Sequence, residues 1–184
     1  MDNGASSYRR FLDGDENGFV ELVRDYKDGL ILYINSFVGS LGVAEELAED
    51  SFVKLGIKKP HFSGNASFKT WLYAVGRNVA LDYIRKQARH PTLPLNECSE
   101  AVGEELLESA YIRDERRIVI HRAMNKLKPE YRQVLWLRFF EDFSAKETAR
   151  IMKKSTHNID TLTYRAKLSL RSELLGEGFD YEDL

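Results

Sequence analysis

Apolar residues three and four positions apart recur along most of this chain, and this spacing constrains the fold more than any other feature. The clearest series consists of Phe19, Leu22, Val23, Tyr26, Leu30, Tyr33, Ile34 and Phe37. Such spacing places side chains on one face of an α-helix, whereas strands need an alternation of apolar and polar residues that the sequence nowhere sustains. With 43% hydrophobic and 30% charged residues over 184 positions, the chain can bury small helical cores. We therefore expect an all-α protein.

Prolines and charge divide the chain into two helical parts. Pro91 and Pro94 directly follow a segment with helical spacing and cannot continue that helix. Residues 91–110 hold five glutamates and neither lysine nor arginine. We expect four segments in this order: a small helical domain at 1–90, an acidic linker at 91–112, a second small helical domain at 113–176 and an acidic tail at 177–184.

The net charge of −2 is the sum of segments whose own net charges differ in size and sign. Residues 1–90 sum to 0 (12 cations minus 12 carboxylates), residues 111–175 to +7 (15 minus 8) and the last nine residues to −4. A basic domain between two acidic segments suggests a polyanion partner for that domain, although solvated helix faces would give the same pattern. We also hypothesise that the acidic tail competes for the basic surface.

Several classes of function have no support in the sequence. No window approaches the run of about 18 apolar residues that a membrane span requires, and the first ten residues lack the apolar core of a signal peptide. We expect a cytoplasmic protein without membrane insertion. The single cysteine, Cys98, excludes an intramolecular disulfide and offers no metal-binding spacing. Phosphate-loop, hydrolase and zinc-protease motifs are absent, so we expect no enzymatic activity, catalytic residue, metal or cofactor.

Residues 67–90 combine two kinds of surface on one predicted helix. An apolar stripe suited to a core consists of Phe68, Leu72, Val75 and Val79, broadened by Trp71. A polar row suited to phosphates and base edges consists of Asn78, Asp82, Arg85 and Arg89, with Lys86 beside it. An ordinary amphipathic surface helix, with Asp82 paired to Lys86, accounts for the composition equally well.

The C-terminal domain has the spacing of a helix-turn-helix. Pro129 opens one helix, and Ser144 with Glu147 forms a capping box that starts the next. Ser155 is the expected N-cap of a further helix, which leaves only a few residues for the turn. Base-facing side chains near the start of that helix would be Thr156, His157, Asn158, Asp160 and Thr161. Cations placed for phosphates would be Lys146, Lys153, Lys154, Arg165 and Lys167.

Taken in order, these patterns resemble the extracytoplasmic function (ECF) sigma factors, the smallest members of the bacterial RNA polymerase sigma family. The resemblance runs from about Phe19 to Leu175 and follows the family's order of region 2, linker and region 4. It implies a region 2 helical bundle that binds core polymerase and recognises and melts the −10 element. It also implies a region 4 helix-turn-helix that reads the −35 element.

The stretch GVAEELAEDSFVKL resembles the family's polymerase-binding helix, with Ala44 at the start of the matching pattern. Glu49 stands where glutamine is common in the family. The glutamate keeps a hydrogen-bond acceptor at this position and adds a negative charge. The resemblance implies binding to the coiled coil of the β′ clamp, and exposed carboxylates suit such a basic partner. The residues assigned to this contact are Glu45, Glu46, Glu49, Asp50 and Phe52.

The helix at 67–90 resembles the family's promoter-melting helix, and HFSGNAS resembles the loop that receives a flipped base of the −10 element. Glycine and asparagine permit the tight backbone of such a pocket, and aromatic and polar walls suit unpaired bases. The residues assigned to −10 DNA are Phe62, Ser63, Gly64, Asn65, Trp71, Arg77, Asn78, Asp82, Arg85, Lys86 and Arg89.

Region 4 matches the family pattern more loosely. Lys153 replaces the turn glycine, Thr148 and Thr163 replace apolar residues, and Asp160 replaces a cation. A carboxylate can accept from cytosine N4 but repels phosphate, so we expect an atypical −35 sequence or weak upstream contact. The residues assigned to −35 DNA are Lys146, Lys153, Lys154, Ser155, Thr156, His157, Asn158, Asp160, Thr161, Arg165 and Lys167.

The resemblance implies core RNA polymerase, through the β′ clamp coiled coil and the β flap, as the protein partner. It also implies single- and double-stranded promoter DNA and a possible anti-sigma factor. Two alternatives remain open: a stand-alone helix-turn-helix regulator, and a degenerate sigma-like module that binds proteins without reading promoters.

Overall fold

The computed structural model describes residues 3–89 and 115–178, and the elements of these ranges are helices without a strand. The N-terminal part holds α1 (Asn3–Leu12), α2 (Glu16–Val38), α3 (Leu41–Lys58) and α4 (Phe68–Arg89). The C-terminal part holds α6 (Glu115–Asn125), α7 (Pro129–Leu135), a π-helix η1 (Trp136–Phe140), α8 (Ala145–Met152) and α9 (Thr156–Gly176). The all-α prediction is confirmed. The predicted acidic linker, with Cys98, and residues 179–184 of the predicted tail lie outside the described residues.

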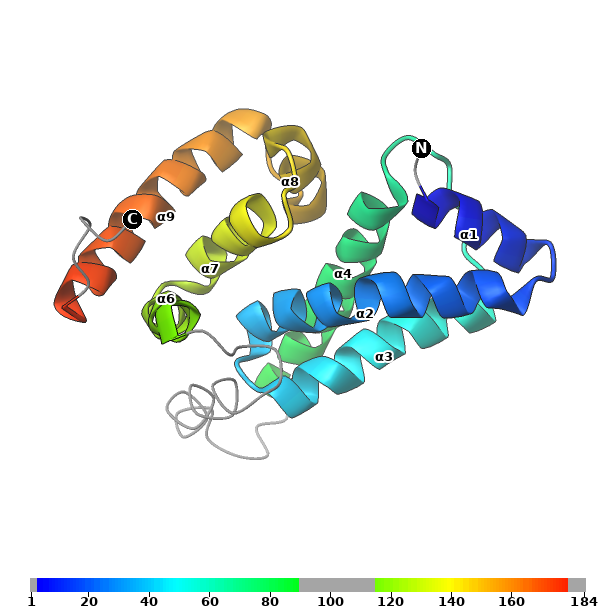
Figure 1. Ribbon diagram of the computed structural model, residues 1–184, viewed down its shortest axis with the longest axis horizontal. Helices are drawn as coiled ribbons and strands as arrows, with labels where there is room; N and C mark the ends of the chain where they lie inside the picture. Colours follow the sequence, from blue (N-terminus) through cyan, green and yellow to red (C-terminus); the bar gives the residue numbers. More distant parts are fainter. Residues whose placement is uncertain (1–2, 90–114, 179–184) are drawn as a thin grey trace.

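Helices α2, α3 and α4 pack against one another to form the core of the N-terminal domain (Figure 1). Asp15 begins α2 by accepting a hydrogen bond from the Asn17 backbone N–H, and Gly39 ends it in the left-handed region at φ 69°. The side chains of Leu30 and Ile34 are fully buried where α4 crosses α2. Gly76 of α4 allows this close approach, because a Cβ there would lie 2.7 Å from a methyl carbon of Leu30.

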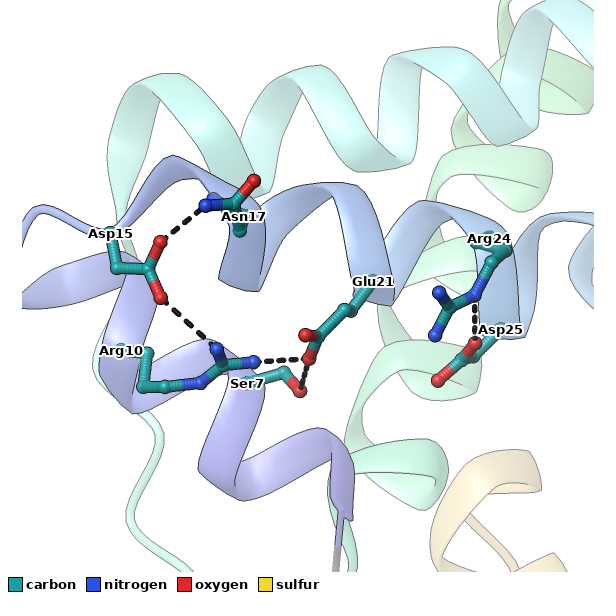
Figure 2. A network of polar contacts seen from close by, with 7 residues as sticks. All are labelled: Ser7, Arg10, Asp15, Asn17, Glu21, Arg24 and Asp25. Atoms are coloured by element: carbon teal, nitrogen blue, oxygen red, sulfur yellow. Dashed lines mark hydrogen bonds and ion pairs between the residues drawn. The ribbon is translucent and has the colours of Figure 1, made fainter.

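Helix α1 is fastened to α2 by a polar network and to α4 by a buried tyrosine. Figure 2 shows Arg10 of α1 between the carboxylates of Asp15 and Glu21, with the Ser7 hydroxyl donating to Glu21 at 2.7 Å. These groups lie near the surface, where an ion pair contributes only about 0–1 kcal/mol. Tyr8 is 1% exposed, and full burial of a large side chain contributes about 1.5–3 kcal/mol, so Tyr8 contributes more to the attachment than a surface ion pair does.

The C-terminal domain contains the helix-turn-helix that the sequence predicts. The Ser144 hydroxyl accepts from the Glu147 backbone N–H, and the Glu147 carboxylate accepts from the Ser144 backbone N–H, so the capping box is present. Ser155 caps α9 by accepting from the Asn158 backbone N–H at 3.2 Å. Lys153 lies in the turn between α8 and α9 with φ 54°, in the conformation that favours glycine.

The π-helix η1 was not expected from the sequence, which indicated only a short break after the helix opened at Pro129. It lies in the stretch WLRFF and turns Trp136 inward while Phe139 and Phe140 stay 47% and 40% exposed. The rings of Trp136 and Phe140 stack with centroids 4.4 Å apart. Each hydrogen bond of a π-helix spans one residue more than in an α-helix. This spacing allows Trp136 to face inward while Phe139 and Phe140 face outward within five residues.

The two domains are packed together in this structure. Figure 1 places the C-terminal helices along one side of the N-terminal bundle, with α7 and α8 nearest to α2 and α4 and with α9 on the outside. Among the described residues, no helix is both long and apolar enough to span a membrane.

Candidate polymerase and nucleic-acid interfaces

The acidic surface expected for protein binding lies on α3. Glu46, Glu49 and Asp50 are exposed, Glu45 is half-buried, and Lys27 of α2 makes a 3.4 Å ion pair with Glu49. Phe52, assigned to the same contact, is 5% exposed and packs edge-on against Phe19 of α2. Its ring therefore supports the helix from inside the core.

Two apolar residues that sequence reasoning left out extend this acidic surface. Val53 and Ile57 of α3 are 51% and 77% exposed, and they follow Glu46, Glu49 and Asp50 at helical spacing. Large apolar side chains beside charged ones on an exposed helix face are typical of protein-binding surfaces. The spacing could have revealed them, but from the sequence alone an apolar residue on a helix is more readily assigned to the core.

The loop at 61–67 rests on aromatic rings from three segments. The Phe62 ring lies 5.4 Å from that of Trp71 and 5.7 Å from that of Phe68, and the Tyr8 ring lies 5.5 Å from Trp71. Ser63, Gly64 and Asn65 are exposed at the tip of the loop, where Gly64 has φ 71°. Trp71 is half-buried under the loop and serves as its floor.

The polar row of α4 is exposed as a continuous helix face. Asn78, Asp82, Arg85, Lys86 and Arg89 all lie on the surface. Asp82 pairs with Arg85 at 3.0 Å, three residues on, and not with Lys86 as the surface-helix alternative supposed. This pair is solvent-exposed and weak, so both side chains can be redirected to a ligand at low cost.

Arg77, also assigned to −10 DNA, differs from the polar row in its burial. It is half-buried, and its Nε is buried without a hydrogen-bond partner among the described residues. Burial raises the pKa of Tyr33 in α2, and the positive charge of Arg77 partly offsets that rise. The guanidinium of Arg77 therefore lies near the buried tyrosine.

The helix-turn-helix presents its predicted base-facing residues at the start of α9. Thr156, His157, Asn158 and Asp160 are exposed and Thr161 is half-buried. Of the cations, Lys146, Lys153 and Arg165 are exposed. Lys154 forms an ion pair with Glu130 at 3.1 Å, and the Lys167 ammonium lies 4.5 Å from the centroid of the Phe139 ring.

The structure also brings the loop at 61–67 against α8, which the sequence did not predict. Arg150 of α8 donates a hydrogen bond to the backbone carbonyl of Asn65. Within the described ranges, no group of three or more His, Cys, Asp or Glu residues is placed to hold a metal ion.

An acidic helix, an aromatic-backed loop beside a polar helix face, and a helix-turn-helix together define a two-domain helical DNA-binding protein. The Sigma-70 region 2 family model matches residues 22–90, and the Sigma-70 region 4 model matches residues 117–170. The chain belongs to the sigma-70 family and is an RNA polymerase sigma factor of the ECF type, a factor of transcription initiation.

Curated relatives span nearly the same length. The chain is 28% identical over 170 residues to the ECF RNA polymerase sigma factor SigW of Bacillus subtilis (strain 168), covering 88% of this chain and 91% of that protein. It is 26% identical over 161 residues to the RNA polymerase sigma factor YlaC of the same organism, covering 84% and 90%.

Among solved structures, the sigma factor RpoE of Bartonella quintana, in complex with the anti-sigma factor NepR, has a similar fold. The TM-score is 0.66 at 22% identity, and the match covers 85% of this chain and 96% of that one.

Proposed function

We propose that this sigma factor docks on core RNA polymerase through the exposed carboxylates of α3. Glu46, Glu49 and Asp50 offer negative charge to a basic partner, and Val53 and Ile57 add an apolar margin. The partner surface, by resemblance to the family, is the coiled coil of the β′ clamp. This role places the protein in the cytoplasm with the polymerase, and RNA synthesis itself belongs to the polymerase.

The proposed −10 interface consists of the loop at 61–67 and the polar face of α4. The exposed loop tip is backed by Phe62 and Trp71, which gives an unpaired base an apolar wall and polar edges. Asn78, Arg85 and Arg89 continue from it along one helix face and would follow the strand. Binding of unpaired bases by the protein favours melted promoter DNA, because the duplex does not offer these bases for binding. This adjacency of an aromatic-backed loop and a polar helix face is the observation that carries the proposal.

The proposed −35 interface is the start of α9. Asn158, His157 and Thr156 are exposed where a recognition helix meets base edges, and Lys146 and Arg165 are exposed for phosphates. Asp160 is exposed as well and would repel phosphate while accepting from cytosine. Region 4 would also contact the β flap of the polymerase, and an anti-sigma factor is a further proposed partner.

Charge reversal on α3 tests the docking proposal. Glu46→Lys should weaken binding to purified core polymerase by about tenfold or more, because like charges then face each other. Asp13→Lys is the matched control, since Asp13 is exposed in the turn between α1 and α2, outside α3, and the charge change is identical. Equal affinities of the two variants would contradict the assignment of α3.

Strand capture is tested by permanganate reactivity of promoter thymines in complexes with core polymerase. Asn78→Ala should retain core binding and lose reactivity relative to Gln87→Ala, which alters the same helix outside the proposed interface. Wild-type binding to core without any opened promoter would favour the degenerate interaction module. Tight, specific binding to duplex DNA without polymerase would favour the stand-alone regulator.

A further inference from the structure

Helix α1 is packed closely against both α2 and the start of α4. A Cβ on Gly18 of α2 would lie 2.3 Å from the Ser7 carbonyl oxygen and 2.9 Å from the Phe11 backbone nitrogen. A Cβ on Gly4 of α1 would lie 2.7 Å from a ring carbon of Phe68, the first residue of α4. Because a side chain at either glycine would prevent this close approach, the two glycines fix where α1 lies on the N-terminal domain.

Two consecutive residues that lead from α3 into the loop at 61–67 contact α1. Lys59 ends α3 in the left-handed region at φ 40°, and its ammonium lies 4.7 Å from the centroid of the Phe11 ring. The next carbonyl, that of Pro60, accepts a hydrogen bond of 2.7 Å from the Tyr8 hydroxyl. The first end of the loop is therefore held by α1 as well as by its connection to α3.

The other end of the loop is held by α4 itself. The Ser67 hydroxyl accepts a hydrogen bond of 3.2 Å from the Thr70 backbone N–H, which joins the loop to the first turn of α4. The tip between the two ends, residues 63–65, is exposed. Within the N-terminal domain, the position of this tip relative to α4 therefore depends on the hydrogen bond to Pro60.

Tyr8 also lies directly beneath the aromatic floor of the loop. Its ring centroid is 5.5 Å from that of Trp71, and the Trp71 centroid is 5.4 Å from that of Phe62 in the loop. Tyr8 is 1% exposed whereas Trp71 is half-buried, so a captured base would meet Trp71 and not Tyr8. An effect of Tyr8 on DNA binding would therefore act through Trp71 and Pro60.

We propose that Tyr8 is a positioning residue of the −10 interface: its hydroxyl holds the loop, and its ring holds Trp71, in the arrangement that receives an unpaired base. This inference rests on the function proposed above for the loop. If the loop sampled several arrangements, only the competent fraction would bind a strand, and the apparent dissociation constant would rise as that fraction fell. A residue that only stabilised the fold would not change strand affinity once the domain is folded.

The affinity of the holoenzyme, the complex of this sigma factor with core polymerase, for a single strand tests this role. The probe is a single-stranded DNA that the wild-type holoenzyme selects from a random-sequence pool. Tyr8→Phe should weaken binding of this strand by about three- to tenfold, the factor that one hydrogen bond contributes to an equilibrium, and leave the affinity for core unchanged. Tyr8→Leu, which also removes the ring, should weaken strand binding further.

Ser36→Ala is the matched control for stability. The Ser36 hydroxyl, like that of Tyr8, donates to a backbone carbonyl, in this case that of Tyr33, and Ser36 is buried in the last turn of α2. Loss of either hydrogen bond should destabilise the fold similarly, but Ser36→Ala should keep the wild-type strand affinity. Equal strand affinities of Tyr8→Phe and Ser36→Ala would overturn the positioning role. A loss of core affinity as large as the loss of strand affinity would overturn it as well.

Fluorescence of Trp71 gives a readout that needs neither polymerase nor DNA. Trp71 and Trp136 are the two tryptophans of the chain, so Trp136→Phe leaves Trp71 as the only one. In this background, Tyr8→Phe should make Trp71 more accessible to quenching by acrylamide, because the loop no longer covers its ring in one arrangement. Ser36→Ala should leave the quenching unchanged.

Contacts with the C-terminal domain also hold this part of the free protein. Arg150 donates a hydrogen bond to the Asn65 carbonyl, and Lys69 of α4 forms an ion pair with Glu141 at 2.9 Å. The fluorescence variants therefore also carry Arg150→Ala, so that the hydrogen bond to the loop tip is absent from all of them.

The two measurements separate failure of this inference from failure of the proposed function. Unchanged Trp71 quenching in Tyr8→Phe would show that Tyr8 does not hold the floor of the loop, and would overturn the inference. A wild-type holoenzyme that selects no strand from the pool would contradict the proposed function of the loop, and with it the role of Tyr8 in DNA binding. Increased quenching in Tyr8→Phe would then still show that Tyr8 holds the loop in place.

Discussion

The hydroxyl of Tyr8 donates a hydrogen bond of 2.7 Å to the backbone carbonyl of Pro60, which joins the first helix to the start of the proposed −10 loop. Tyr8 lies outside residues 22–90, the part matched by the region 2 family model. Its ring packs against Phe68 and Trp71, with centroids 5.3 and 5.5 Å away. Helix α1 thus supports the loop from beneath.

Removing only that hydroxyl should loosen the loop while leaving the core filled. Tyr8→Phe should lower the free energy of unfolding by about 0.5–1.5 kcal/mol, the net worth of one hydrogen bond, as measured by urea denaturation. Tyr164→Phe is the matched control, because Tyr164 is 65% exposed. Equal free energies of unfolding of the two variants would mean that the hydrogen bond to Pro60 does not stabilise the fold.

Lys153 offers a stabilising substitution. Its φ of 54° strains any residue with a Cβ, and the sigma pattern has glycine at this position. Lys153→Gly should raise the free energy of unfolding by about 0.5–1 kcal/mol, although the flexibility of glycine in the unfolded chain offsets part of the gain.

Thermal denaturation of Lys153→Gly beside Lys146→Gly provides the check. Lys146 lies in the first turn of α8, where glycine should lower stability by up to about 1 kcal/mol. Destabilisation by both glycines would show that the turn does not strain Lys153.

Glu147 should make stability depend on pH in the acid range. Burial acts to raise the pKa of Glu147, but hydrogen bonds from Ser144, Thr70 and Ser67 outweigh burial and hold the pKa below its usual value of 4.5. A carboxyl whose pKa is lower in the folded chain stabilises the fold above its unfolded pKa, and this contribution is lost as the pH falls through the folded value.

Glu147→Gln, which can still cap a helix, is the reference for this effect. The stability difference between wild type and Glu147→Gln, measured by urea denaturation, should be largest near neutral pH. It should shrink steadily once the pH falls below about 4.5. A difference that stays constant down to acid unfolding would refute the role of the ionised carboxylate.

Local rules allowed the sequence to predict the helices and the helix-turn-helix. The capping box of Ser144 with Glu147 and the N-cap at Ser155 depend on residues three positions apart, and both are present. The turn at Lys153 followed from a pattern that expects glycine, and its positive φ explains why. The assignments of individual residues to polymerase and DNA remain predictions.

Relations between distant residues could not be predicted in this way. Glu141 and Lys69 are 72 positions apart, and Arg150 and Asn65 are 85 apart, so no periodicity connects them. The support of the loop by Tyr8 depends likewise on tertiary packing.

Run-off transcription with purified core polymerase on a library of genomic fragments tests the central claim most directly. Wild type should yield transcripts from defined start sites, and Gln87→Ala should yield the same set. Asn78→Ala should reduce them by about tenfold, as expected for the loss of a base contact worth about 1–3 kcal/mol. Promoter-specific RNA from none of these proteins, although wild type binds core, would contradict the proposed promoter recognition.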